Sequence, residues 1–328
     1  MTKSESIRRA KETVEARRVE SIAAYERRIA EVSAAVPEFA EIDRELQKTG
    51  PKIVAASFGG GDSKAEIEAI RQEYEQIAAR RREMLVRHGY APDYASIRYS
   101  CEKCSDTGYV GIDICDCLKR EIVRNFLESS GLYSLTKNQT FDTFCLDYYE
   151  KNDRIVMEQN VAFLRDYAES FDPSSSANLI LIGATGLGKT HLSSAVARRV
   201  IERGFFVVYE CAQGLFSEYE ARRFRTNSYS ASDEGEDIDR FVDCDLLIID
   251  DLGTEITNRF SISCLYYLLN QRLIRHRPTV ISTNLRSTEL RSRYEDRIMS
   301  RVFGEFIPLQ FSGSDVRMQK VKKVKSES

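Results

Sequence analysis

Long apolar segments are missing from this sequence of 328 residues. No run approaches the roughly 20 apolar residues that a membrane-spanning helix needs. The first residues, MTKSESIRRAKETVEARR, also lack the apolar core of a secretory signal peptide. We therefore expect a cytoplasmic protein that has no membrane partner.

A strong charge of one sign is missing as well, because 48 Lys and Arg residues nearly balance 51 Asp and Glu residues, for a formal net charge of −3. Nothing in this total requires a polyanionic partner, so nucleic-acid binding must be argued from individual segments. Internal repeats and long low-complexity tracts are absent. The length and the 42% of hydrophobic residues suit two domains with at least one full core.

The first part of the chain predicts a helical arm. Apolar residues recur at helical spacing over residues 4–36, and again from Ile67 to Leu85. Between them, the segment KTGPKIVAASFGGGDS contains Pro51 and three consecutive glycines, and we expect it to break the helix. Two such helices would pack as an antiparallel hairpin. The arm is either a charged stalk that only spaces or solubilises, or a docking arm for a protein partner.

Four of the eight cysteines lie within residues 101–117, in the sequence CEKCSDTGYVGIDICDC. Two pairs of thiolates that are joined by a glycine-containing turn can close a tetrahedral Zn²⁺ site. We expect structural zinc on Cys101, Cys104, Cys115 and Cys117, and a reduced or redox-active cluster is the alternative. The scattered cysteines have apolar neighbours and are expected to be small core residues: Cys145, Cys211, Cys244 and Cys264.

From residue 177 onward, short β-branched runs alternate with helix-length segments. The runs are NLILIG, FFVVYE, DLLIID, PTVIST and EFIPLQF, and they predict a parallel five-stranded sheet covered on both faces. We therefore expect an α/β fold. The predicted division is a helical arm over 1–95, a Cys₄ zinc element over 96–120, a helical linker over 121–176 and a nucleotide-binding domain over 177–328.

Residues 183–190 match the phosphate-binding pattern G-x-x-x-x-G-K-[ST], and they lie between a predicted strand and a predicted helix. Glycines let the backbone N–H groups approach the phosphates, and the helix adds its positive end. Lys189 is expected to bind the β and γ phosphates of ATP, and the Thr190 hydroxyl to bind Mg²⁺. The nucleotide-binding set is Gly183, Ala184, Thr185, Gly186, Leu187, Gly188, Lys189, Thr190 and Asp250.

The strand DLLIIDD supplies the carboxylates for the other side of the metal. Asp250 would bind Mg²⁺ directly or through water, and Asp251 would orient or deprotonate the attacking water. Asn284, at the end of VISTN, would position the same water. Positive charge for the γ phosphate could come from Arg297 or Arg301, which lie four residues apart and would serve a neighbour's site in trans. Arg317 could instead act in cis.

These motifs in this order, GATGLGKTHL, LLIIDDLG, ISTN, RIMSRVFG and SGSDVRMQK, resemble the AAA+ ATPases of the DnaC/DnaI helicase-loader family and the related IstB-type transposition ATPases. The resemblance covers roughly residues 140–320. It implies an AAA+ P-loop core that self-associates side by side and binds ATP between neighbours, where Arg301 or Arg297 completes the adjoining site and Arg317 is sensor 2. An Asp-Asp pair replaces the wider Asp-Glu pattern. The resemblance also implies that the zinc-bearing region contacts a replicative DnaB-type helicase.

A possible nucleic-acid contact lies between the second and third predicted strands. Arginines flank an aromatic residue there, a mixture that could contact the backbone of single-stranded DNA and stack one base: Arg222, Arg223, Phe224 and Arg225. The acidic run from Asp233 to Asp239 opposes a simple basic groove, and the basic tail KVKKVKSES is expected to be a solvated extension.

Three functions fit these features. The first is an ATPase that loads the replicative DNA helicase onto single-stranded DNA. The second is an IstB-like transposition helper ATPase, and the third is a nucleotide-dependent adaptor with little turnover. The zinc cluster and the long arm ahead of the ATPase domain favour the loader over the transposition helper. Substitution of Asp251 by Asn discriminates the loader from the adaptor.

Overall fold

The computed structural model describes residues 2–58, 63–130, 138–225 and 236–319. The chain divides into two compact units, of which one is Lys11–Leu118 and the other combines Met1–Ala10 with Lys119–Ser328. We call them the arm unit and, after the activity that the sequence motifs predict for it, the ATPase unit, and we describe each by itself. Among the described residues, no helix is both long and apolar enough to cross a membrane.

The ATPase unit is built on a five-stranded sheet in which every neighbouring pair is parallel. Its strands run in the order β4-β5-β6-β3-β7. Their β-branched and leucine-rich sequences are almost entirely buried in the three central strands, as expected for a sheet covered on both faces. The prediction of a parallel five-stranded α/β fold is confirmed. The strands are β3 (Asn178–Ile182), β4 (Val207–Cys211), β5 (Leu246–Leu252), β6 (Thr279–Thr283) and β7 (Phe306–Gln310).

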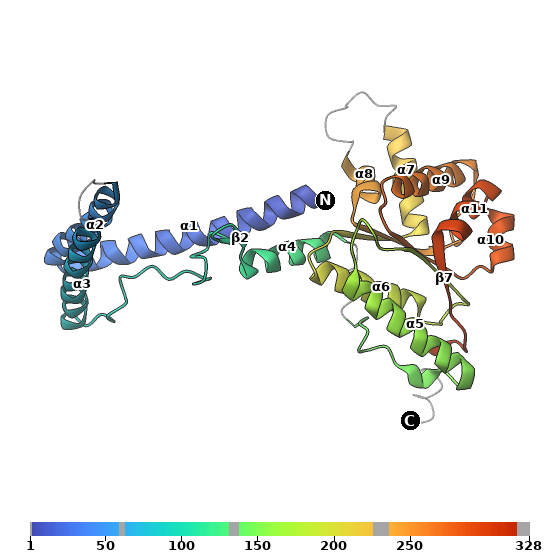
Figure 1. The fold of residues 1–328 in the computed structure, drawn as a ribbon, viewed down its shortest axis with the longest axis horizontal. Coiled ribbons are helices and arrows are strands. Elements are labelled where there is room, and N and C mark those ends of the chain that lie inside the picture. The colour runs from blue at the N-terminus through green and yellow to red at the C-terminus, as the bar shows by residue number, and fades with distance from the viewer. Residues whose placement is uncertain (1, 59–62, 131–137, 226–235, 320–328) are drawn as a thin grey trace. The chain divides into compact units, whose positions relative to one another are not determined.

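Helices enclose this sheet (Figure 1). Helices α5 and α6 pack against each other on one side of it, and α7 and α9 pack against each other on the other side. The helices are α4 (Asp116–Ser129), α5 (Lys151–Ser170), α6 (Lys189–Glu202), α7 (Ala212–Arg225), α8 (Glu236–Asp243), α9 (Arg259–Ile274), α10 (Ser287–Arg293) and α11 (Asp296–Glu305), with a 3₁₀ turn at Leu146–Tyr148.

The strand order decides where the functional site forms. Strand β6 lies between β3 and β5, although it follows both in the sequence. The carboxyl ends of these three parallel strands therefore meet at one edge of the sheet, where α/β proteins commonly bind ligands. The phosphate-binding loop follows β3, the acidic pair ends β5 and Asn284 follows β6.

The first residues of the chain pack on the ATPase unit. The ammonium of Lys3 lies 2.6 Å from the buried carboxylate of Asp245. The side-chain amide of Asn125 donates to the Ser6 carbonyl oxygen at 2.9 Å. Residues 1–10 are thus part of the ATPase unit, and their removal would expose a buried carboxylate.

The arm unit contains helices α2 (Pro37–Phe58) and α3 (Ser63–Arg87) and most of α1 (Lys3–Ala35), so three helices contribute to it instead of the two that the sequence predicts. The helix α1 ends just before Pro37 and α2 begins there, because proline favours the first position of a helix and restricts the residue before it. The segment KTGPKIVAASFGGGDS does separate two helices, because α2 ends at Phe58 and α3 begins at Ser63, but the part expected of Pro51 is wrong, since Pro51 lies inside α2. Packing of α2 along α3 outweighs the cost of an internal proline, about 3 kcal/mol.

A small apolar core and a buried ion pair stabilise this unit. Its core residues are Val32, Val36, Phe39, Leu85 and Ala95. Nearby, the guanidinium of Arg81 donates to Asp43 at 2.9 Å and to the Ala95 carbonyl oxygen at 2.7 Å. The ion pair therefore ties α2 to α3 and to the segment that leads toward the cysteines.

Candidate nucleotide-binding and metal sites

The phosphate-binding loop connects β3 to α6 and depends on two glycines. Gly186 and Gly188 have φ angles of +81° and +80°, a region that other residues adopt with strain. A Cβ at Gly186 would lie 2.1 Å from the Asp315 carboxylate, and one at Gly188 would lie 2.6 Å from the Phe144 ring. The loop is therefore shaped both by its own turns and by two segments that press against it.

Lys189 is held inside this loop. Its ammonium donates to the carbonyl oxygens of Gly183 at 2.6 Å and Ala184 at 2.8 Å. Burial lowers the pKa of Lys189, while the negative charges of Asp251 and Asp250 oppose that change. In the described part of the chain no carboxylate forms an ion pair with Lys189, so the ammonium can exchange its two carbonyl partners for phosphate oxygens.

The acidic pair occupies an irregularity in β5. The register against β6 shifts between Ile249 and Leu252, and Asp251 has a φ of +55°. Such a bulge re-aims side chains that would otherwise alternate between the two faces of the sheet. Asp250 is buried and accepts a hydrogen bond from the Ser282 hydroxyl on β6. Burial and the charge of Asp250 raise the pKa of Asp251, against the opposing effects of Lys189 and Arg317.

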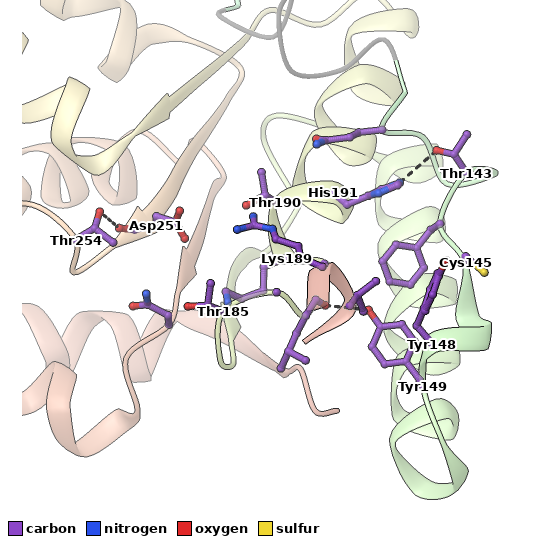
Figure 2. Close-up of a pocket in the computed structure, with 18 residues that line it drawn as sticks. Thr143, Cys145, Tyr148, Tyr149, Thr185, Lys189, Thr190, His191, Asp251 and Thr254 are labelled. Atoms are coloured by element: carbon purple, nitrogen blue, oxygen red, sulfur yellow. Dashed lines mark hydrogen bonds between the residues drawn. The ribbon is translucent and has the colours of Figure 1, made fainter. Parts of the chain in front are cut away.

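The loop and Asp251 meet in one pocket of about 410 Å³. In Figure 2, Lys189, Thr190 and Thr185 extend toward this pocket from one side, and Asp251 and Thr254 face it from the other. Asn284 and Arg317 also line it. Asp250, Gly183 and Ala184 are not among its lining residues. The structure thus brings together these predicted residues from four separate segments: Thr185–Thr190, Asp251, Asn284 and Arg317.

One wall of the pocket was missed by the sequence analysis, which interpreted it as a linker. Phe144 stacks on Tyr149 with 5.8 Å between ring centroids, and the Tyr149 hydroxyl donates to the Leu187 carbonyl oxygen at 3.1 Å. The Nε2 atom of His191 lies 2.8 Å from the Thr140 carbonyl oxygen and 3.3 Å from the Thr143 hydroxyl, and Figure 2 shows the contact with Thr143. Within the described part of the chain, the buried side-chain oxygen of Gln139 has no hydrogen-bond partner. The aromatic residues of TFDTFCLDYY were the signal that could have revealed this wall.

Arg297 and Arg301 lie outside this pocket, on α11. Both guanidinium groups stack on the ring of Tyr266, a residue of α9, at 4.8 and 4.7 Å from its centroid. Arg301 also donates to the Tyr266 hydroxyl at 3.1 Å. The expectation that the two arginines share one helix face is confirmed, because both contact the same ring.

The four clustered cysteines have the separations of a tetrahedral metal site. All four sulfur atoms lie within 4.8 Å of one another, with 3.8 Å between Cys101 and Cys115 and 3.4 Å between Cys104 and Cys117. Tetrahedral Zn–S bonds of about 2.3 Å place sulfurs about 3.8 Å apart. Burial alone would raise the pKa of Cys104, but hydrogen bonds from the Gly108 backbone and from the other thiols lower it to about 7. The residues present therefore fit Zn²⁺.

A short hairpin joins the two cysteine pairs. Strands β1 (Tyr109–Val110) and β2 (Asp113–Ile114) pair antiparallel, as expected for two pairs of ligands that close on one ion. The scattered cysteines divide differently from the prediction. Cys244 and Cys264 are buried, whereas Cys145 and Cys211 are exposed, so their interpretation as core residues is wrong. Cys145 lines the nucleotide pocket, and Cys211 ends the edge strand β4.

The predicted DNA contact lies at the end of α7. Arg222 pairs with Asp239 at 3.9 Å, and the Arg223 guanidinium lies 5.1 Å from the centre of the Phe260 ring. The side chains of Phe224 and Arg225 lie outside the described residues, as do Asp233 and the basic tail. The two described arginines thus interact within the ATPase unit.

Known proteins resemble the chain over the region that contains the nucleotide pocket. A family model described as IstB-like ATP binding protein matches residues 132–306, more than half of the chain. The replicative helicase loader DnaC of Escherichia coli (strain K12) is 26% identical over 176 residues, which cover 53% of this chain and 66% of that protein. The chain thus spans slightly less than two thirds of that relative.

Two further proteins are similar to the chain at a lower sequence identity. The phage-like element PBSX protein XkdC of Bacillus subtilis (strain 168) is 23% identical over 248 residues, which cover 71% of this chain and 89% of that protein. The crystal structure of the DnaC helicase loader superposes with a TM-score of 0.46 at 18% identity, over 54% of this chain and 98% of that chain. The resemblance found in the sequence motifs is confirmed, and the chain belongs to the family of IstB-like ATP binding proteins.

Proposed function

We propose that this protein hydrolyses ATP in order to load a replicative DNA helicase onto single-stranded DNA. The observation that carries the proposal is the pocket that joins Lys189, Asp251 and Arg317. It supplies a phosphate ligand, a carboxylate and a second cation around one space large enough for a nucleotide. The loader role comes from the similarity to DnaC, and with it a site of action in the cytoplasm.

The positions of these groups support the hydrolysis of ATP, with one role for each group. Lys189 binds the β and γ phosphates, while Asp251 accepts a proton from the water that attacks the γ phosphorus. The bond from that phosphorus to the β-phosphate oxygen breaks, and ADP and phosphate leave. Asn284 orients the water, and Arg317 stabilises the charge that develops on the γ oxygens.

Magnesium fits the donor set beside this site. Asp250 is a buried carboxylate that accepts a hydrogen bond from the Ser282 hydroxyl, and within the described residues no cation pairs with it. A buried carboxylate of this kind suits a hard cation, and Thr190 would supply a hydroxyl ligand. When bound, Mg²⁺ neutralises charge on the β and γ phosphates.

Self-association completes the proposed site. Arg297 and Arg301 are presented at Tyr266 and do not line the pocket of their own chain. A head-to-tail interface would offer them to the γ phosphate of a neighbour, because a heterologous contact joins two different surfaces of the same chain. Such arginines typically accelerate phosphoryl transfer by about 10³-fold or more.

Two other parts of the chain would contact the helicase and the single-stranded DNA. The Cys₄ element, with Zn²⁺ on Cys101, Cys104, Cys115 and Cys117, would hold the arm unit in a shape that binds the helicase. Arg222 and Arg223 on α7, together with Phe224 and Arg225, would contact single-stranded DNA. Because the described ion pair of Arg222 is long and partly exposed, phosphate groups could compete for it.

Native mass spectrometry of the full-length chain with the replicative helicase of its host tests the proposal. We expect a defined complex that forms with a non-hydrolysable ATP analogue and weakens when Lys189 is changed to Ala. The full chain is used because residues 1–10 pack on the ATPase unit. Absence of a complex under all nucleotide conditions would contradict the loader role and favour the transposition helper, which the family description supports.

The third function, an adaptor with little turnover, is separated by Asp251→Asn. In a loader, this variant should bind ATP and the helicase but fail to release the helicase from DNA. If release proceeds at the wild-type rate, hydrolysis is not required, and the protein acts as a nucleotide-dependent adaptor.

A further inference from the structure

Glu255 is a buried carboxylate that the hydrolysis mechanism does not use. Its exposed fraction is 2%. It accepts hydrogen bonds from the Gly253 N–H at 2.8 Å, from the Thr257 hydroxyl at 3.3 Å and from the Tyr294 hydroxyl. In the residues that the structure describes, no Lys or Arg forms an ion pair with it. Such burial is costly, so a carboxylate at this position calls for an explanation beyond packing.

One end of this cluster begins at the nucleotide pocket. Thr254 lines the pocket together with Asp251. Its N–H and its hydroxyl both bind the Asp251 carbonyl oxygen, at 3.2 and 2.9 Å. Figure 2 shows this contact at the side of the pocket opposite Lys189. Glu255 is the next residue, so movement of the segment that carries Asp251 would move the carboxylate.

The other end holds the start of α11. Tyr294 directly follows α10, which ends at Arg293, and lies two residues before Asp296, where α11 begins. Beside it, the Arg293 guanidinium donates to the Glu255 carbonyl oxygen at 2.5 Å and to the Thr257 hydroxyl at 2.7 Å. Burial and the hydrogen bond to Glu255 raise the pKa of Tyr294, which keeps its hydroxyl protonated as a donor.

We infer that Glu255 and Tyr294 are positioning residues that couple the nucleotide pocket of one chain to the arginines that it presents on α11. Hydrogen bonds from two segments converge on one buried carboxylate, so a shift of the loop after β5 is transmitted to the helix that carries Arg297 and Arg301. This inference rests on the proposed use of those arginines by a neighbouring chain. It adds that the occupied pocket of one chain controls catalysis in the next.

Subunit mixing tests the inference with Tyr294→Phe, which removes only the hydroxyl. By itself this variant should lose ATPase activity about tenfold, within the usual range of coupling between sites. It should regain activity when mixed with Asp251→Asn, which binds ATP but cannot hydrolyse it, so that its pocket is occupied and its arginines are correctly positioned. Random mixing of equal amounts pairs an intact pocket with intact arginines at about one quarter of the interfaces.

A parallel mixture separates failure of the inference from failure of the proposed function. The double variant Arg297→Ala/Arg301→Ala should also regain activity with Asp251→Asn. If this mixture recovers and the Tyr294→Phe mixture does not, Tyr294 acts within its own site and the inference is overturned. If neither mixture recovers, the arginines do not act in trans, and the proposed arrangement falls together with the inference. Full activity of Tyr294→Phe alone would also overturn it.

Two further variants exclude a general effect on folding. Tyr167→Phe removes another buried tyrosine hydroxyl of the ATPase unit, one that donates to the Ala177 carbonyl oxygen at 3.0 Å. It should keep wild-type ATPase activity even if its unfolding midpoint falls as much as that of Tyr294→Phe. Glu255→Gln keeps the volume of the side chain but removes its charge, and it should regain activity with Asp251→Asn as Tyr294→Phe does.

Discussion

The backbone N–H of Asp251 donates a hydrogen bond of 2.9 Å to the hydroxyl oxygen of Ser282. The same hydroxyl donates to the carboxylate of Asp250. One side chain on β6 thus fixes both members of the acidic pair at the bulge in β5. The sequence shows no sign of this relationship, because Ser282 lies 31 residues after Asp251.

Substitution of Ser282 by Ala should therefore lower kcat more than it weakens ATP binding. The carboxylate of Asp250 would lose a hydrogen bond of a kind typically worth about 1.5–3 kcal/mol, which corresponds to about tenfold or more in rate. Steady-state kinetics with ATP measure the effect. Thr279→Val, which removes a buried hydroxyl at the other end of β6, should change stability but not kcat. Equal losses of kcat in the two variants would argue against this role for Ser282.

The raised pKa of Asp251 predicts an acid limb in the activity profile. The ordinary pKa of an aspartate is about 3.9, and burial together with the charge of Asp250 raises the pKa of Asp251 above it. As the pH falls through the raised pKa, Asp251 takes up a proton and can no longer accept one from water. The rate of hydrolysis should decline while the pH is still above the ordinary aspartate range. Binding of a non-hydrolysable analogue at the same pH values controls for protonation of the nucleotide.

The variant Asp251→Asn should bind ATP normally and lose hydrolysis by about 10²-fold or more, the usual contribution of a general base. Its residual activity should lack the acid limb. A nucleotide-binding assay and a phosphate-release assay separate the two effects. Hydrolysis at the wild-type rate would show that another group accepts the proton.

Gly186→Ala should damage both folding and nucleotide binding. A left-handed backbone costs a residue with a Cβ about 1–2 kcal/mol, and here the added atom would also meet Asp315. Displacement of Asp315 would carry Arg317 with it, since the Arg317 N–H donates to the Asp315 carboxylate at 2.8 Å. At Gly304 on α11, an added Cβ would contact no described side chain or neighbouring segment within 4 Å, so Gly304→Ala should instead stabilise the folded protein by about 0.5–1 kcal/mol. Urea unfolding of both variants tests this contrast, and equal midpoints would contradict it.

The cysteine cluster should hold about one zinc ion per chain. Cys104→Ser should lose this metal, because three thiolates and a hydroxyl form a weaker site. Cys211→Ser should retain it, because Cys211 is exposed on β4 and is not part of the cluster. Elemental analysis of protein purified without chelators measures the content. The same metal content in both variants would exclude the cluster. A mass lower by two protons per disulfide, without metal, would favour the redox alternative.

Local patterns predicted the elements of the ATPase unit well. The five strands and the α6 helix begin close to the residues that the apolar runs and the phosphate-binding pattern indicate. Pro51 shows the limit of such patterns in the arm unit. A proline usually ends a helix, but its local cost was smaller than the gain from packing α2 against α3.

Other features depended on contacts between distant residues. The aromatic residues around Phe144 and Tyr149 indicate that this segment packs on something, but no local pattern shows that their partner is the phosphate-binding loop, and the segment was therefore interpreted as a linker. The exposure of Cys145 and Cys211 could not be predicted for the same reason, because apolar neighbours in the sequence do not determine which side chains are buried.

The sequence by itself determined the chemistry: a lysine in a glycine-rich loop, two carboxylates at the end of a strand and four thiols at the spacing of a metal site. These are local patterns, set by residue type and by separations of a few positions. Only the tertiary structure decided which groups meet. The insertion of β6 between β3 and β5 places Asn284 and Ser282 beside the acidic pair, and the folding of α10 against the loop after β5 brings Tyr294 to Glu255. Strand order and helix packing depend on the burial of the whole apolar core, and no single segment encodes them.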